Sequence, residues 1–270
     1  MQSALGSRHI ATDSDNKAKT SMLSPIKIRD ANIKQIRQAC SNCSLRELCL
    51  PIGMTREEMR QIDQLVTQGR PIRRGEYLYR AGQRFHSLYA VRLGFFKTSI
   101  ISEDGREQVT GFHMNGELMG LDAISTTRHT CDAVALEDGE ICELPFTDME
   151  TLARRIPALQ HHLYRMMSRE IVRDHSVMLL LGNMKAEERI AAFLLNLSHR
   201  FEQRGYSHSS FHLRMTREEI GSYLGLKLET VSRTLSRFQE QGLIKVQNRL
   251  IDLSDEDGLR LLVSSSADEE

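Results

Sequence analysis

One segment near the carboxyl end specifies its own structure: Thr216-Arg-Glu-Glu-Ile-Gly-Ser-Tyr-Leu-Gly-Leu-Lys-Leu-Glu-Thr-Val-Ser-Arg233. Its first four residues have the pattern of a capping box, which predicts a short helix from Arg217 to Leu224. Gly225 allows a tight turn, after which a second helix is predicted from about Lys227 to Gln241. Two helices joined by a glycine-containing turn are typical of a helix-turn-helix, and we expect one here.

The second of these helices carries side chains suited to reading DNA. Glu229, Ser232 and Arg233 share one face of its N-terminal turns, which meet base edges in such motifs. Arginine can donate two hydrogen bonds to guanine, a carboxylate can accept one from cytosine, and serine can bond to either kind of base. A helical pair with surface charges and no DNA is the alternative, but the alternating residues 243–253 add a hairpin wing that favours DNA. The cations expected to contact phosphates are Arg214, Arg217, Arg237, Lys245 and Arg249.

A long helix is predicted before this motif, from Pro157 to about Met184, with apolar residues at coiled-coil spacing. This helix could pack only on its own domain. We favour pairing of two copies into a homodimer, because a second apolar set, Leu159, Leu163 and Met166, is left for packing within the chain. The pairing seam consists of Tyr164, Met167, Ile171, Asp174, Met178 and Leu181, at intervals of 3, 4, 3, 4 and 3 residues.

The acidic residue Asp174 interrupts this seam. In a dimer, two such carboxylates would face each other in a partly desolvated place and would weaken association. We interpret Asp174, flanked by Met167, Ile171 and Met178, as a switch that keeps dimerisation marginal. The alternative is that Asp174 simply turns toward solvent.

Residues 52–156 have the composition of a small β-structure. Glycines recur between short apolar runs such as Phe95–Ile101, and Asp104-Gly105 marks a hairpin turn. Many short strands with regular turns predict an antiparallel roll or barrel. A short helix behind Thr55, from Arg56 to Gln68, is expected to precede the strands.

Three of the five cysteines lie within ten residues, at Cys40, Cys43 and Cys49. The first two can bind one metal ion or two corners of a cluster, and a loop brings in the third. A fourth ligand would have to be Cys131 or Cys142, and three local thiolates with a distant one suit a [4Fe–4S] cluster. Zinc, which also takes four thiolates, is the competing interpretation, and reduced thiols without any ligand are a third.

The whole chain limits what else the protein could be. Its 270 residues with 40% hydrophobic content suffice for two domains, and 36 basic residues balance 36 acidic ones, so a DNA-binding face must be local. The sequence has no secretory signal or transmembrane stretch and has an odd number of cysteines, which indicates the cytoplasm and no membrane partner. It contains no G-x-S-x-G or H-E-x-x-H motif, so no enzyme is expected, and His113, His161 and His162 are assigned to packing or the surface.

These features predict the α+β fold class, with an N-terminal antiparallel β-roll, a long dimerisation helix and a C-terminal winged helix-turn-helix. The expected parts are a disordered tail (1–34), an iron–sulfur cysteine loop (35–51), a sensory roll (52–156), the dimerisation helix (157–185), the DNA-binding domain (186–253) and an acidic segment that frays at its end (254–270).

Six stretches of the chain form a set that is specific in combination. They are Cys40-Ser-Asn-Cys-Ser-Leu-Arg-Glu-Leu-Cys49, Ser87-Leu-Tyr-Ala-Val-Arg92, Gln108-Val-Thr-Gly-Phe-His113, Glu143-Leu-Pro-Phe146, Asn183-Met-Lys-Ala-Glu-Glu-Arg-Ile-Ala-Ala-Phe193 and Leu224-Gly-Leu-Lys-Leu-Glu-Thr-Val-Ser-Arg233. Together they resemble the CRP/FNR superfamily of transcription regulators, and its oxygen-responsive members in particular. The likeness covers most of the chain, from about Cys40 to Leu253, and implies a roll of the cyclic-nucleotide-binding type.

The resemblance implies a [4Fe–4S] cluster held by Cys40, Cys43, Cys49 and Cys142. Cys142 lies beside Glu143-Leu-Pro145, where the family has its distant cysteine. The implied function is a global regulator that dimerises and binds DNA without oxygen, and whose cluster is lost or converted when oxygen attacks. A regulator of the same superfamily that uses zinc, or that works without a cluster, is the alternative.

The resemblance also implies the partners. The residues that match the family's base-reading E-x-x-S-R are Glu229, Ser232 and Arg233. The implied double-stranded operator is an inverted repeat of TTGAT half-sites. Ile171 and Asp174 match positions on the family's dimerisation helix, and loops around 102–107 match a surface that contacts RNA polymerase.

The chain departs from the cyclic-nucleotide binders of the superfamily. Those proteins hold the ribose with a glutamate and the phosphate with an arginine. Here Leu121 stands where the carboxylate would be, and Thr130-Cys131-Asp132 provides no arginine for the phosphate. We therefore expect no cyclic nucleotide to bind.

Overall fold

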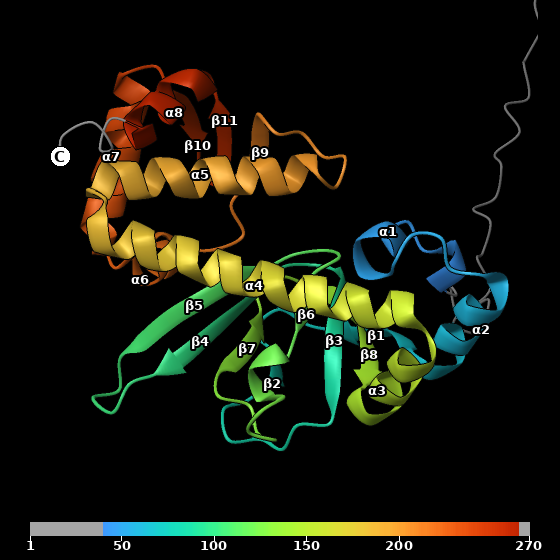
Figure 1. Cartoon of the computed structure of the whole chain (residues 1–270). Coiled ribbons are helices and arrows are strands. Elements are labelled where there is room, and N and C mark those ends of the chain that lie inside the picture. The colour runs from blue at the N-terminus through green and yellow to red at the C-terminus, as the bar shows by residue number, and fades with distance from the viewer. Residues whose placement is uncertain (1–39, 265–270) are drawn as a thin grey trace, which may run out of the picture. The chain divides into compact units, whose positions relative to one another are not determined.

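The structure is a computed structural model that describes residues 40–264. The predicted tail, residues 1–34, lies outside the described residues, as do the first residues of the predicted cysteine loop. Within the described range the strands form three antiparallel sheets, two in the N-terminal roll and one in the C-terminal part (Figure 1). The predicted α+β class, with a roll, a long helix and a winged helix-turn-helix, is confirmed.

The roll packs its two sheets against each other. In the described chain, the first sheet has the order β1 (Thr67–Ile72), β8 (Gly139–Pro145), β3 (Ser87–Leu93) and β6 (Leu118–Met119). The second sheet, likewise among described residues, has the order β2 (Tyr77–Tyr79), β7 (Asp132–Ala135), β4 (Phe96–Ile101) and β5 (Glu107–His113). Tyr79, Val91, Phe96 and Ile141 are buried in the shared core, since alternate side chains of each strand face inward.

Two helices cover one end of the roll. Helix α2 (Arg56–Leu65) begins with a capping box, in which the Thr55 hydroxyl accepts a hydrogen bond from the Glu58 N–H at 3.2 Å. It ends three residues before its predicted end, because β1 already begins at Thr67. Helix α3 (Phe146–Arg155) follows β8 directly and shares a buried apolar core with α2.

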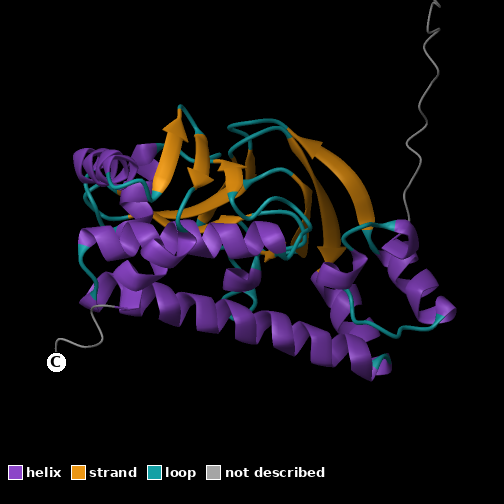
Figure 2. Ribbon diagram, turned by 90° about the horizontal axis from the view of Figure 1, so that it is seen from above, coloured by secondary structure: helices purple, strands orange, loops and turns teal. Residues whose placement is uncertain are grey.

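The predicted long helix is α4 (Pro157–Asn183), and proline in its first turn suits a helix start. The chain then reverses into α5 (Ala186–Glu202). Arg189 stabilises this corner, because its guanidinium donates hydrogen bonds to the carbonyls of Leu181 at 2.9 Å and Met184 at 2.8 Å. Figure 2 shows the long helices gathered on one side of the strands. Among the described helices none is long and apolar enough to span a membrane.

The C-terminal part contains the predicted helix-turn-helix. Its elements are β9 (Ser210–His212), α6 (Arg217–Leu224), α7 (Leu228–Glu240), β10 (Ile244–Gln247), β11 (Leu250–Leu253) and α8 (Glu256–Ser264). The predicted capping box is formed: the Thr216 hydroxyl accepts from the Glu219 N–H at 3.1 Å, and the Glu219 carboxylate accepts from the Thr216 N–H at 2.7 Å. Gly225 ends α6 with a φ of +63°, a left-handed conformation that glycine adopts without strain.

Helix α8 was not predicted, because its segment was interpreted as acidic and frayed. Leu259 is fully buried, and Leu262 and Val263 pack beside it on the core of the C-terminal part. The apolar residues span little more than a helical turn and are flanked by acidic residues, so the sequence shows almost no periodicity there.

The core of the C-terminal part continues onto the roll. The Phe112 ring of β5 lies 6.1 Å from the Phe193 ring of α5 and 5.2 Å from the Tyr223 ring of α6, measured between centroids. All three belong to or pack against one buried cluster that includes residues of the roll and of the helix-turn-helix. The C-terminal part is therefore docked on the β5 side of the roll.

Candidate functional site

The cysteine loop is made of short turns rather than long helices. Turns occur at Cys40–Asn42 and, as α1, at Arg46–Cys49. Asp63 of α2 anchors the beginning of the loop, because its carboxylate accepts a hydrogen bond from the Cys40 N–H at 2.5 Å. Leu50 anchors the other end, since it is buried in the apolar core that α2 shares with the roll.

The distant Cys142 reaches the same place from the roll. It lies on β8 opposite Ala90 of β3, and its thiol faces a cavity of about 50 Å³. That volume is several times the roughly 10–15 Å³ that one water molecule needs. The predicted ligands that line this cavity are Cys40, Cys43, Cys49 and Cys142, set among mostly apolar side chains.

Cys131, the other candidate for the distant ligand, lies elsewhere. It is buried in the core between the two sheets. Burial, followed by the charge of Asp122, raises the pKa of its thiol to about 12. The spacing of the cysteines alone left Cys131 and Cys142 open, and the structure places Cys142 with the other three.

The four thiols affect one another electrostatically. Burial is the main cause that raises the pKa of the Cys49 thiol to about 12. The next causes are the negative charges that Cys43, Cys142 and Cys40 would carry, while Arg204 acts in the opposite direction. Burial also raises the pKa of the Cys142 thiol. Without a bound cation, such thiols stay protonated, because burial disfavours the thiolate and several thiolates in one apolar cavity repel each other.

A cation in the cavity would reverse this balance. Thiols that coordinate a metal are deprotonated, so mutual repulsion is replaced by attraction to a shared positive centre. Three ligands from a loop and one from a strand match the four-cysteine set of a [4Fe–4S] cluster. All five cysteines are described and none is in a disulfide. Among the described residues, no three or more histidine, cysteine, aspartate or glutamate side chains are grouped closely enough to hold one metal ion.

His162, in the first turns of α4, is a part of this site that sequence reasoning missed. It is buried, lines the cavity, and donates a hydrogen bond to the Cys49 carbonyl. Its Nε2 atom is buried without a partner among the described residues. Burial, and then the charge of Arg165, lower the pKa of the ring. The available signal was its position three residues after Leu159, on the inward face of the helix.

The predicted DNA-reading residues point outward. Glu229, Ser232 and Arg233 are exposed on the first half of α7. Val231 and Leu235, on the opposite face, are buried against the rest of the motif. The helix therefore presents its polar face as a groove-binding helix must.

The predicted phosphate contacts differ among themselves. Lys245 and Arg249 of the wing are exposed. Arg214 forms an ion pair with Glu137 at 3.1 Å, and Arg237 pairs with Glu187 of α5. Arg217 is half-buried, and burial lowers its pKa. Its Nη1 atom has no partner among the described residues.

Helix α4 presents the predicted seam to the outside. Its exposed large apolar residues are Tyr164, Met167, Ile171, Val172, Met178 and Leu179, which are 39% to 65% exposed. Asp174 is exposed among them, and Leu181 is partly buried near the corner with α5. A contiguous apolar face of this kind is typical of a protein–protein interface.

Another cavity, of about 490 Å³, lies between the roll and α4. Carboxylates of Asp122, Glu170 and Asp174 line it. Arg173 also lines it, but its guanidinium is 3.7 Å from the Glu117 carboxylate and forms a close ion pair with Glu170. Negative charge thus prevails at this cavity.

Two family models match the chain. A cyclic nucleotide-binding domain matches residues 70–155, and a Crp-like helix-turn-helix domain matches residues 188–262.

Curated relatives extend over nearly the whole chain. The transcriptional activator protein Anr of Pseudomonas protegens is 45% identical over 247 residues, which are 92% of this chain and 100% of the relative. The fumarate and nitrate reduction regulatory protein of Yersinia pestis is 44% identical over 226 residues, 84% of this chain and 90% of the relative. Among solved structures, FixK2 from Bradyrhizobium japonicum matches with a TM-score of 0.68 and 32% identity, over 73% of this chain and 96% of that one.

Proposed function

The chain belongs to the CRP/FNR family of DNA-binding transcription regulators, which are not enzymes, and we propose that it is an oxygen-responsive member whose DNA binding depends on a [4Fe–4S] cluster. The observation that carries this proposal is the meeting of Cys40, Cys43, Cys49 and Cys142 at one cavity beside the start of α4. These four residues would hold the cluster. When bound, it supplies oxygen-labile bonds between the cysteine loop and β8.

The residues around the cavity connect the loop to the dimerisation helix. His162 of α4 donates a hydrogen bond to the Cys49 carbonyl, and Leu159 of α4 and Leu50 of the loop share one core. A loop that moves toward Cys142 would therefore also shift its contacts with the first turns of α4. Shifting a marginal dimer needs a bias of a few kcal/mol, which is within what a metal site can contribute.

We propose that the exposed face of α4 is the dimer interface and that Asp174 keeps the dimer weak. Replacing Asp174 with alanine removes the facing charges, so Asp174→Ala should shift the protein toward dimers in air. Sedimentation velocity measures this shift, with Asp148→Ala, at an exposed aspartate of α3, as the matched control. An unchanged profile for Asp174→Ala would remove its switching role.

The dimer would place two α7 helices about one DNA turn apart, roughly 34 Å. Glu229, Ser232 and Arg233 would then read two TTGAT half-sites of an inverted repeat. Two weak half-site contacts become one strong contact through effective concentration, and so dimerisation controls affinity.

The hairpin between β4 and β5 is the proposed contact for RNA polymerase. Its tip, residues 102–106, is exposed and carries a 2.6 Å ion pair between Arg106 and Asp104. Ile101, beside the tip, is 66% exposed. A polar tip with an exposed apolar neighbour suits a protein partner.

We also propose that the chain binds no cyclic nucleotide, although its roll matches that domain type. The cavity beside α4 exposes Asp122, Glu170 and Asp174, which would repel a phosphate, and Arg173 is already paired. Titration calorimetry with cyclic AMP should detect no binding, and micromolar affinity would contradict this part of the proposal.

Oxygen-free purification tests the central proposal. We expect brown protein with iron and sulfide in equal amounts, which binds the inverted repeat tightly and releases it after exposure to air. Colourless protein that contains zinc would favour a zinc-stabilised regulator. Iron-free protein that still binds the operator tightly would contradict the cluster requirement.

A further inference from the structure

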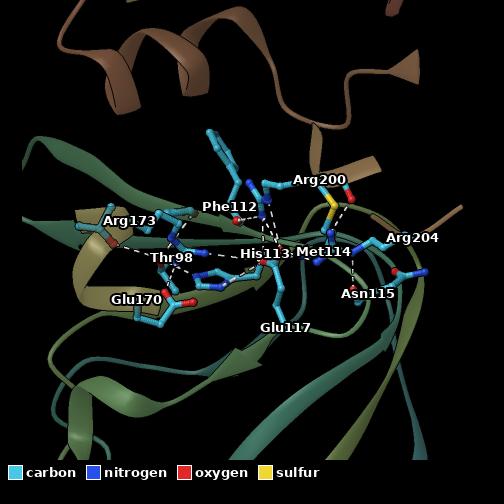
Figure 3. A network of polar contacts seen from close by, with 12 residues as sticks. Thr98, Phe112, His113, Met114, Asn115, Glu117, Glu170, Arg173, Arg200 and Arg204 are labelled. Carbon is cyan, nitrogen blue, oxygen red and sulfur yellow. Dashed lines mark hydrogen bonds and ion pairs between the residues drawn. The ribbon is translucent and has the colours of Figure 1, made fainter. Parts of the chain in front are cut away.

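An ion-pair network joins the end of α5 to a turn of the roll (Figure 3). The carboxylate of Glu117, between β5 and β6, accepts hydrogen bonds from Arg200 at 2.8 Å and from Arg204 at 2.6 Å. Arg200 also donates to the Phe112 carbonyl at 2.7 Å, and Arg204 to the Asn115 carbonyl at 2.5 Å. The side chains of Glu117, Arg200 and Arg204 are 14%, 13% and 5% exposed, so these charge-assisted bonds are shielded from water.

The same turn supports the cysteine loop. Gly116, next to Glu117, has a φ of +83°, and a β-carbon built on it would lie 2.6 Å from Cδ1 of Leu48. Leu48, the neighbour of Cys49, therefore rests directly on the backbone of the turn. Strand β3 holds the turn in place: the Gly116 N–H donates to the Val91 carbonyl at 2.7 Å, and the Val91 N–H donates to the Glu117 carbonyl at 2.9 Å.

We propose that Glu117 is the positioning residue that transmits the seating of the cysteine loop to the DNA-binding domain, an inference that rests on the proposed function. The contacts are continuous, from Leu48 to Gly116, from Glu117 to Arg204, and along α5 to α7, which packs on it. Close-packed interiors are poorly compressible, so a shift of the turn displaces α5. The loop thus reaches α7 through the turn and α5, without requiring the exposed faces of two α4 helices to pair, although Arg173 of α4 also faces Glu117.

The charges explain why the carboxylate is needed. Arg173 also faces Glu117, at 3.7 Å, so three arginines surround this one carboxylate. Of the three, Arg173 also pairs with Glu170. Removing the carboxylate leaves Arg200 and Arg204 partly buried without their acidic partner, which separates α5 from the turn.

A different polar contact between the same two parts provides a matched control. Lys97 of β4 lies 2.9 Å from Glu107 and 3.1 Å from Glu219 of α6. The Val109 N–H donates to the Ser222 hydroxyl of α6 at 2.8 Å. These contacts lie along the β4–β5 hairpin rather than on the turn beneath the cysteine loop.

The test compares operator affinity with and without the cluster, using full-length protein in each state. In Glu117→Gln we expect the ratio of the two affinities to fall about fivefold or more, with iron and sulfide content unchanged. Arg204→Lys keeps the charge but loses the fork geometry, so it should also lower the ratio. This second variant keeps the test decisive in the event that Glu117→Gln folds poorly. Lys97→Met should weaken both states alike and leave the ratio unchanged. Folded variants of Glu117 and Arg204 that keep the parental ratio would overturn the proposal.

Hydrogen exchange of the metal-free protein tests the link without relying on the cluster. Leu48→Ala should speed amide exchange in residues 114–117 and 200–204 but not in residues 219–222. Unchanged exchange in the first two segments would overturn the link. If the operator affinity of the parental protein did not depend on the cluster, the proposed function would fail. The exchange measurement would still decide whether a change in the loop affects α5.

Discussion

The cysteine loop and the helix-turn-helix are built in opposite ways. The helix-turn-helix is specified locally: a capping box starts α6, Gly225 ends it, and α7 buries one face against it. The cysteine loop has no side-chain cap on its helical turn. It is positioned by the remote groups Asp63 and His162, and it faces Cys142 across a cavity. A locally specified element keeps its shape when its surroundings change, whereas a remotely positioned one follows whatever fills the space between its contacts. This contrast suits the proposed function, in which the helix-turn-helix is a DNA reader of fixed shape and the cysteine loop is an adjustable sensor that controls it.

Loss of the remote cysteine is the most severe test of this contrast. Cys142→Ala removes the proposed ligand on β8, so oxygen-free protein should lose nearly all of its iron if Cys142 holds the cluster. Cys131→Ala is the matched control, because Cys131 is a buried thiol in a different core and its variant should keep the iron. Iron and sulfide assays on both proteins measure the outcome. Equal loss in the two variants would reject the assignment of Cys142.

Glu117 lies between the two regions, and its removal should have the next largest effect. Burial alone would raise the pKa of its carboxyl, but Arg200, Arg204 and Arg173 outweigh burial and lower the pKa from 4.5 to about 2. Breaking a buried ion pair by removing one partner typically costs about 3–5 kcal/mol. We expect Glu117→Gln to lose a free energy of unfolding of that order at neutral pH, measured by urea denaturation.

The pH dependence distinguishes this charge effect from a packing defect. A depressed carboxyl pKa gives stability that is fully present above about pH 4.5 and is lost as the pH falls toward about 2. The parental protein should therefore lose stability in this window, and the difference from Glu117→Gln should shrink. Burial, and then the charge of Arg173, lower the pKa of His113 to about 3, so protonation of His113 destabilises both proteins as the pH falls below 6.5. Glu117 opposes this lowering, so the His113 contribution is larger in Glu117→Gln. A constant difference across the window would contradict the charge assignment.

The same contrast explains what could be predicted from the sequence. Thr216 and Gly225 act within a few residues of themselves, so the bounds of α6 were predicted correctly and those of α7 to within a residue. The choice between Cys131 and Cys142 depends on the register of β8 with β3, which spacing does not encode. The bonds of Glu117 to Arg200 and Arg204 join residues 83 and 87 positions apart, and no local pattern marks them. Local signals thus predicted the helix-turn-helix, while the contacts between the cysteine loop, the turn at Glu117 and α5 required the fold.

The smallest expected effect concerns the reader alone. Arg233 is exposed at the start of α7, and a bidentate bond to guanine is worth about 1–3 kcal/mol at one base position. Arg233→Ala should therefore weaken binding to the intact half-site by that amount and relax specificity at that position. Because the reader keeps its shape, the loss should be the same with and without the cluster. Binding titrations against half-site variants measure it, with Lys245→Ala, an expected phosphate contact on the wing, weakening all sequences alike. A loss for Arg233→Ala that is uniform across sequences would make it a phosphate contact, and a loss that depended on the cluster would show that the sensor reshapes α7 itself.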